Sequence, residues 1–157
     1  MNYNSGKSKN SCCCEEEEEW PHIKSYAQYT TYNNSSDSIS VEKNANIVFR
    51  ERKISRGDKI ELKSGRIKLK GGSYLIYFLG VAEPVEDNTE LAIVKQNTTI
   101  AATMNTTSGQ ISITSIIRID PAGAYIDIKN LSKRTISFYT TSPNGNIVSP
   151  YIIIEEI

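Results

Sequence analysis

The sequence is poor in the residues that most often perform catalysis or bind metals. It has one histidine, His22, and three cysteines, which are adjacent at positions 12 to 14. A catalytic nucleophile needs a base within reach, and one histidine next to Pro21 is a weak basis for a Ser/His or Cys/His pair. No phosphate-binding loop, dinucleotide fingerprint or zinc-ligand spacing is present either. We therefore expect no enzyme activity, no catalytic residue, no metal and no cofactor.

The chain also lacks an excess of either charge and any long apolar run. Lysine plus arginine equals aspartate plus glutamate at 18 each, so no general basic field attracts nucleic acid or an anionic membrane. The longest apolar stretches, such as 74–82, fall short of the roughly 20 residues of a membrane-spanning helix. Residues 1–10 carry no apolar segment of a secretion signal. We expect no nucleic-acid or membrane partner, and synthesis in the cytoplasm without a signal peptide.

Composition divides the chain near residue 22. Residues 1–22 form a polar arm that contains the cysteine run and a glutamate run, and Pro21 disfavours helix for the residue before it. From residue 25 onward Tyr, Thr, Ile and Val dominate, and Asn, Gly, Ser and Asp interrupt them at short intervals. This spacing is typical of an all-β sandwich. We expect an N-terminal extended arm at 1–22 and one folded domain at 23–157.

The segment 73–81 is the most apolar part of the predicted domain. Apolar side chains occupy both alternating sets of positions, which is typical of a central strand covered on each side. One of its faces must therefore pack against something other than the domain's own second sheet. Four of its residues are candidates for the core or for this second contact: Tyr74, Ile76, Tyr77 and Phe78.

The remaining pattern predicts about ten short antiparallel strands, which together make a jelly-roll sandwich. In the strand predicted at 66–70, Ile67 and Leu69 share a buried face while the charged residues point to water. No convincing helix or internal repeat is found. Further strands are predicted at 26–32, 45–49, 59–62, 91–95, 110–119, 125–129, 135–140 and 150–155.

One run carries a family resemblance: Ile67-Lys68-Leu69-Lys70-Gly71-Gly72-Ser73-Tyr74-Leu75-Ile76-Tyr77. It resembles the core of the C1q/TNF-like jelly roll, and looks closest to the C-terminal domains of spore-surface collagen-like glycoproteins of Bacillus and Clostridium and their collagen-free exosporium relatives. The likeness covers about residues 24–157. Further segments fall in the family's order at 26–29, 90–98, 117–128 and 151–154.

The resemblance implies a homotrimer with a structural role on the spore surface. It makes Tyr74, Ile76, Tyr77 and Phe78 the expected residues of the trimer interface or the core. The chain departs from the family in having no Gly-x-y repeat, so a collagen stalk is excluded. Its short, acidic, cysteine-bearing arm instead resembles the arms that tie one endospore appendage subunit to the next. The expectation is a self-assembling exosporium or appendage subunit, a trimer and then a polymer, with other spore-surface proteins as further partners.

The alternative is a soluble trimeric module that binds carbohydrate or a receptor, since jelly rolls also serve as lectins. Exposed aromatic side chains on loops would favour it. The sequence offers only weak candidates for that role, namely Tyr32, Tyr125 and Tyr151.

The cysteine run of the arm calls for an intermolecular explanation. Cys12, Cys13 and Cys14 cannot brace a fold by pairing with one another, because neighbouring cysteines close almost no loop. The chain has no other cysteine, so a useful disulfide must join two molecules. We favour covalent linking between subunits. Two alternatives stay open: incidental reduced thiols in a polar tail, and metal binding, which adjacent cysteines serve poorly.

The arm has two further features that bear on contacts. Trp20, the only tryptophan, is predicted to anchor the arm in a pocket of its own domain, with a neighbour's pocket as the alternative. Glu15–Glu19 is by default a solvated charge run. The alternative is that the run pairs electrostatically with basic residues on a neighbouring copy. The candidate basic residues are Arg50, Arg52, Lys53 and Arg56.

Other polar groups are interpreted as surface features. The acidic residues Glu83, Glu86 and Asp87 lie in a turn-rich segment and are expected to face solvent, because glycosidic chemistry would need a cleft. Three segments fit the glycosylation acceptor pattern, and in a chain without a secretion signal they are interpreted as polar loop and strand residues. They begin at Asn97, Asn105 and Asn130.

Overall fold

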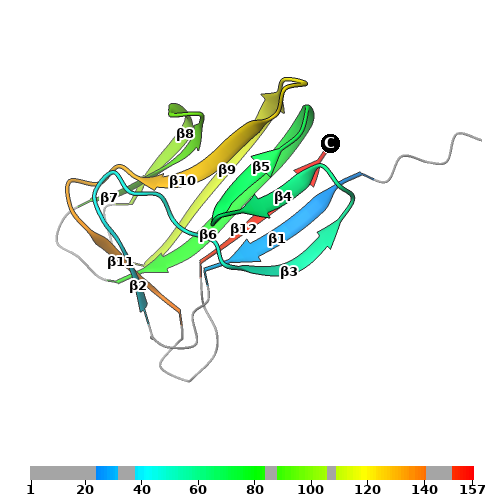
Figure 1. Cartoon of the computed structure of the whole chain (residues 1–157). Helices are drawn as coiled ribbons and strands as arrows, with labels where there is room; N and C mark the ends of the chain where they lie inside the picture. Colours follow the sequence, from blue (N-terminus) through cyan, green and yellow to red (C-terminus); the bar gives the residue numbers. More distant parts are fainter. Residues whose placement is uncertain (1–23, 32–37, 84–87, 106–108, 141–149) are drawn as a thin grey trace, which may run out of the picture.

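The computed structural model describes residues 24–31, 38–83, 88–105, 109–140 and 150–157. These residues form twelve strands and no helix, and every strand pairing between them is antiparallel. The strands lie in two sheets that pack face to face (Figure 1). The predicted all-β antiparallel jelly roll is thereby confirmed.

The larger sheet has seven strands within the described residues. Its order is β2-β11-β6-β12-β1-β3, and β9 pairs with the other side of β6. The long central strand β6 therefore has β12 on one side and β9 on the other (Figure 1). The strands are β1 (Tyr26–Thr30), β2 (Ser38–Val41), β3 (Glu51–Arg56), β6 (Gly72–Ala82), β9 (Gly109–Ile119), β11 (Ile136–Tyr139) and β12 (Tyr151–Glu156).

The smaller sheet has five strands in the described part of the chain, in the order β4-β5-β10-β7-β8. Its edge strands are β4, which follows β3 after a short turn, and β8, at the opposite side (Figure 1). The strands are β4 (Ile60–Lys63), β5 (Arg66–Leu69), β7 (Thr89–Lys95), β8 (Thr98–Asn105) and β10 (Ala124–Asn130).

The core lies between the two sheets and is filled by alternate residues of their strands. In β6 the inward residues Tyr74, Ile76 and Phe78 are fully buried, and the Phe78 ring meets Phe138 of β11 edge to face with centroids 6.3 Å apart. The Tyr74 hydroxyl donates a hydrogen bond of 2.9 Å to the carbonyl of Lys70. Burial raises the pKa of Tyr74 to about 12, so this hydroxyl remains a donor at neutral pH.

The strand predicted at 45–49 is wrong, because only an isolated bridge forms there. The segment instead crosses from one sheet to the other. The Ile47 amide donates to Ile128 of β10 at 2.7 Å, whereas the Arg50 amide donates to Thr30 of β1 at 2.9 Å. Its alternate side chains are nevertheless buried, which explains why the sequence pattern resembles that of a strand.

Three strands were missing from the sequence prediction, namely β2, β3 and β8. Two of them, β3 and β8, are edge strands with largely exposed side chains, so they lack the apolar alternation that marks a half-buried strand. The third, β2, has four residues and also lies at a sheet edge. Polar edge strands limit unwanted pairing between molecules, and the same polarity hides them from pattern analysis.

Candidate functional site

The outward side of β6 is apolar although it faces away from the core. Leu75, Tyr77 and Leu79 alternate with the fully buried inward residues of the same strand and are only partly exposed. In a solvated sheet this side would carry polar residues. The structure therefore confirms that the strand is apolar on both faces, and it leaves the outward face without cover from the described residues.

The neighbouring strands extend this apolar side across the seven-stranded sheet. Cross-strand partners share a face, and the register places apolar residues next to β6 on both flanks. On one flank Tyr151 and Ile153 of β12 lie opposite Leu79 and Tyr77, and on the other Ile116 of β9, opposite Leu75, is 66% exposed. Ile54 of β3 is 55% exposed and is separated from Ile153 by Gln28 of β1. We name the apolar outer face as the set Ile54, Leu75, Tyr77, Leu79, Ile116, Tyr151 and Ile153.

Two tyrosines lie near the middle of the apolar outer face. The rings of Tyr77 and Tyr151 are tilted by 51° with centroids 6.2 Å apart. Burial raises the pKa of Tyr151, and the nearby Tyr77 hydroxyl raises it further. Both side chains offer large apolar area with a polar tip, which is the combination enriched at protein interfaces.

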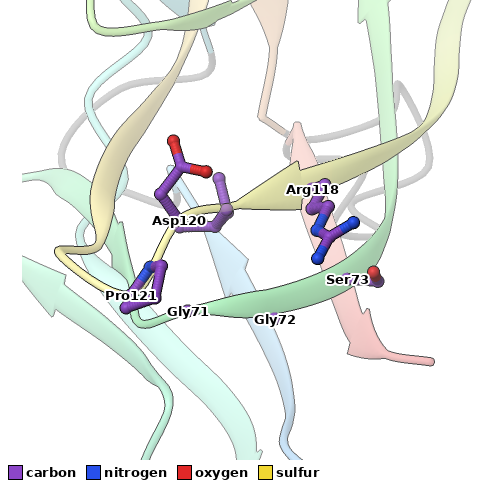
Figure 2. Close-up of a pocket in the computed structure, with 7 residues that line it drawn as sticks. Gly71, Gly72, Ser73, Arg118, Asp120 and Pro121 are labelled. Carbon is purple, nitrogen blue, oxygen red and sulfur yellow. The ribbon is translucent and has the colours of Figure 1, made fainter.

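Polar residues flank the apolar outer face. In β9 the outward residues before Ile116 in the chain are Ser112 and Thr114, and Arg118 is the outward residue after it, near the end of the strand. A hollow of about 570 Å³ opens there between the ends of β6 and β9. Figure 2 shows the guanidinium of Arg118 beside Ser73, with the carboxylate of Asp120 directed away from it. An apolar centre with a polar border is the usual composition of a protein–protein interface.

A hydrogen-bond network holds the ends of the strands that carry this face. Lys59 donates to one oxygen of the Glu156 carboxylate, and the backbone amide of Ser25 donates to the other at 3.0 Å. The Ser25 hydroxyl in turn accepts from the Lys59 amide at 3.2 Å. The bond from Lys59 is the largest of the effects that lower the pKa of Glu156. The network ties β1 and β12 to the turn between β3 and β4.

A second hollow, of about 420 Å³, lies between the two sheet edges formed by β3 and β4. Arg50 and Arg52, two of the basic residues singled out in the sequence, line it. Arg56, at the end of β3, lies opposite Tyr26 and faces away from the core. The predicted basic cluster is thus gathered on and beside one edge strand, although its members point to different sides of it.

Three of the four residues assigned to the core or the trimer interface are core residues. Tyr74, Ile76 and Phe78 lie in the core, and Tyr77 lies on the apolar outer face. Ile54, Ile116 and Ile153 were not predicted to belong to this face. Their neighbours in space come from strands far away in the chain, so local alternation signalled an apolar side chain but not the surface to which it contributes.

Several predicted features lie outside the described residues. These are Cys12, Cys13, Cys14, the run Glu15–Glu19, Trp20, His22, Tyr32, Glu86 and Asp87.

Two of the aromatic candidates for ligand binding are already in contact with other side chains. Tyr151 packs against Tyr77, and the Arg66 guanidinium lies 4.8 Å from the centre of the Tyr125 ring. The same guanidinium binds the buried Asp127 carboxylate at 2.6 and 2.9 Å. In the described residues, therefore, these rings help to build the sheets.

The glycosylation acceptor patterns have different environments. The Asn97 side chain is exposed in the turn between β7 and β8, whereas Asn130 is fully buried. The Asn130 amide donates to the carbonyls of Val41, Glu42 and Arg134, at 2.9, 3.2 and 2.8 Å. This amide is a structural group and is not accessible to a modifying enzyme in the folded chain.

Two kinds of feature are absent from the described residues. No helix there is long and apolar enough to cross a membrane. No group of three or more His, Cys, Asp or Glu side chains there is placed to hold a metal ion.

The architecture matches solved structures at low sequence identity. Murine APRIL matches with a TM-score of 0.65 at 14% identity, over 86% of this chain and 100% of that one. Eiger, a TNF from S. frugiperda, gives 0.66 at 11%, over 85% and 92%, and the globular domain of zebrafish complement 1qA gives 0.55 at 11%, over 84% and 94%. No protein-family model and no curated protein matches the sequence. The domain has the C1q/TNF-like jelly-roll fold.

Proposed function

We propose that this protein is a non-enzymatic structural subunit that forms a homotrimer through its apolar outer face. The observation that carries the proposal is the position of Leu75, Tyr77 and Leu79 on the uncovered side of a central strand. Leaving apolar area in water costs roughly 25 cal/mol per Å², so a partner that covers this face is favoured. Three identical copies can each cover the face of a neighbour in a closed ring.

The trimer is further supported by the C1q/TNF-like fold, because the family that the sequence resembles implies a homotrimer. The polar border of the apolar outer face favours a defined interface over unlimited association. The exposed edge strand β3 carries charged residues, which disfavours edge-to-edge pairing as the mode of assembly.

We further propose that the trimers join into a filament or layer on the spore surface, as an exosporium or appendage component. The support is the resemblance to spore-surface proteins together with the acidic, cysteine-bearing arm. Intermolecular disulfides of Cys12, Cys13 and Cys14 would lock contacts that packing has already made.

The test of the trimer is the mass of the full chain measured by sedimentation equilibrium. Tyr77→Glu and Ile153→Glu each place a charge within the apolar outer face, where burying it without a partner costs several kcal/mol. We expect a trimer for the parent and a dissociation at least tenfold easier for either variant.

Thr99→Glu is the matched control, because Thr99 is exposed on β8 at the far edge of the other sheet. Its mass should remain that of the parent. A parent that sediments as a monomer, or variants that keep the parent's assembly, would refute the proposed interface. Circular dichroism spectra that match the parent show that the variants are folded.

A further inference from the structure

The structure leaves an open groove where the edges of its two sheets meet. β3 is the edge of the seven-stranded sheet and β4 the edge of the five-stranded sheet, and the hollow of about 420 Å³ lies between them. Figure 1 shows both strands on the same side of the sandwich, joined by a short turn. We name this the edge groove, and its lining includes Tyr29, Arg50, Arg52, Ser55, Ile60 and Leu62, together with the carboxylates Asp58 and Glu61.

The edge groove and the apolar outer face lie on opposite sides of β3. Arg52 is opposite the buried Tyr29, and Ser55 is opposite the buried Ala27, so both point toward the inner side of the sheet. Ile54, between them, belongs to the outer side. The register shifts between Gln28 and Tyr29 and skips Lys53, and this shift places Arg52 on the same side of β3 as Ser55. A trimer formed through the outer face would therefore leave the edge groove accessible.

The edge groove presents positive charge that the described residues do not neutralise by ion pairing. Arg50 and Arg52 are exposed and form no ion pair with another described residue. Of the two carboxylates in the lining, Asp58 binds Lys70 at 2.8 Å, and Glu61 lies opposite Lys68 in the register of β4 and β5.

Guanidinium groups bind carboxylates well, because their planar fork can donate two parallel hydrogen bonds. The chain itself contains a run of five carboxylates, Glu15–Glu19. An extended segment of that length spans roughly 17 Å, which is close to the length of a six-residue strand such as β3. Charge and length therefore both suit this segment as the occupant of the edge groove.

We propose that the edge groove binds the Glu15–Glu19 segment of a second copy of the chain. The proposal rests on the self-assembly proposed above, and it names the surface that receives the arm. A second copy is favoured over the same copy because Tyr26 lies opposite Arg56. The chain's own run, joined to β1 by six residues at that end of β3, would have to double back to reach Arg50.

The test traps the contact with a disulfide that only two different full-length chains can form. The donor is the parent chain, with its cysteines next to Glu15. The acceptor carries Cys12→Ser, Cys13→Ser, Cys14→Ser and Ser55→Cys, so its single thiol lies in the edge groove. After incubation with oxidised glutathione at low salt, non-reducing electrophoresis and peptide mass spectrometry measure the donor–acceptor bond.

Two further acceptors make the result specific. One carries Thr99→Cys in place of Ser55→Cys, on the exposed edge strand β8 of the same domain. The other adds Arg50→Glu and Arg52→Glu to Ser55→Cys. If Arg50 and Arg52 served only to keep the sheet edge charged and so prevent strand pairing, charge reversal would preserve that role.

We expect trapping at position 55 to exceed trapping at position 99 at least tenfold. It should fall to the control level after charge reversal and in 1 M sodium chloride, where screening acts over about 3 Å. Equal trapping at the two positions, or trapping that charge reversal or high salt leaves unchanged, would overturn the proposal. Sedimentation of the same chains separates the two ideas, because trimers without specific trapping refute only the edge-groove contact, and trapping by monomers refutes only the trimer.

Discussion

Single residues at the ends of the sandwich connect segments that are distant in the chain. Asn130 is buried, and besides its three donated hydrogen bonds its side-chain oxygen accepts one from the Ser132 amide at 2.8 Å. A buried amide with four partners is costly to remove, because each lost partner leaves an unsatisfied backbone group. The sequence identified Asn130 only as part of a short acceptor pattern, whereas the fold gives it a structural role.

Glu156 has a comparable position and, in addition, a dependence on pH. Its carboxylate binds Lys59 and Ser25, and the bond from Lys59 lowers its pKa in the folded chain. A lowered pKa stabilises the folded state when the carboxyl is ionised. The contribution is complete above the ordinary range of the carboxyl, near 4.3, and is lost as the pH falls through the lower value of the folded state.

We therefore expect Glu156→Gln to reduce the free energy of unfolding by about 1 kcal/mol at pH 7, since the Lys59 side chain is partly exposed. The difference from the parent should disappear at about pH 2, where Glu156 of the parent is protonated in the folded and in the unfolded state. Urea denaturation at fixed protein concentration measures both values. Glu42→Gln, at an exposed loop position, is the control and should change neither. A deficit of the same size at both pH values would contradict the ion-pair explanation.

At the scale of elements, short turns determine how the chain crosses from one sheet to the other. The turn between β9, in the seven-stranded sheet, and β10, in the five-stranded sheet, contains Gly123 with a φ of 77°. Its amide donates to Asp120 at 2.8 Å. A Cβ at Gly123 would lie 2.8 Å from the Leu69 carbonyl oxygen, which belongs to the backbone of β5 and cannot move aside easily.

Gly123→Ala should consequently destabilise the domain by about 1–3 kcal/mol, through the left-handed backbone and the close contact with β5. Ala122→Ser, in the same turn and exposed, should change the free energy of unfolding by less than about 0.5 kcal/mol. Urea denaturation of the two variants beside the parent gives the comparison. If Gly123→Ala is as stable as the parent, the backbone conformation assigned to this turn is wrong.

At the scale of the whole molecule, strand β3 separates two surfaces with different proposed partners. Its outer side contributes Ile54 to the apolar outer face, and its inner side contributes Arg52 to the edge groove. Hydrophobic association depends weakly on salt, whereas contacts between exposed charges are screened by it. Assembly by these two routes can therefore be separated by ionic strength, with the trimer more resistant than the contact made by the arm.

The cysteines of the arm are predicted to act only at this largest scale. Replacing Cys12, Cys13 and Cys14 by serine should leave the free energy of unfolding and the trimer unchanged, because no disulfide can form within the domain. Disulfide-linked species larger than a trimer should disappear. Non-reducing electrophoresis and negative-stain electron microscopy, with and without reductant, provide the measurement. Discrete particles from the parent under oxidising conditions would contradict a polymer locked by these thiols.

The fold class of this protein and most of its strands follow from the sequence alone. Period-2 alternation, as in Ile67 and Leu69, and turn residues at short intervals predict an all-β sandwich, because both signals arise from local backbone geometry. The same alternation shows that 73–81 is apolar on two faces, so the pattern of this one segment is enough to predict that one face packs against something other than the domain's own second sheet.

Strand pairing, in contrast, determines which side of β6 faces the core and which residues of other strands lie beside its outward side chains. Alternation states that Tyr74 and Tyr77 point in opposite directions, but not which of them is covered, since this depends on how distant strands pair. Register alone brings Ile116 and Ile153 next to β6 from other parts of the chain. Edge strand β3 was not predicted from the sequence for a related reason. Its neighbours and its solvent exposure are set by the sheet and not by its own sequence.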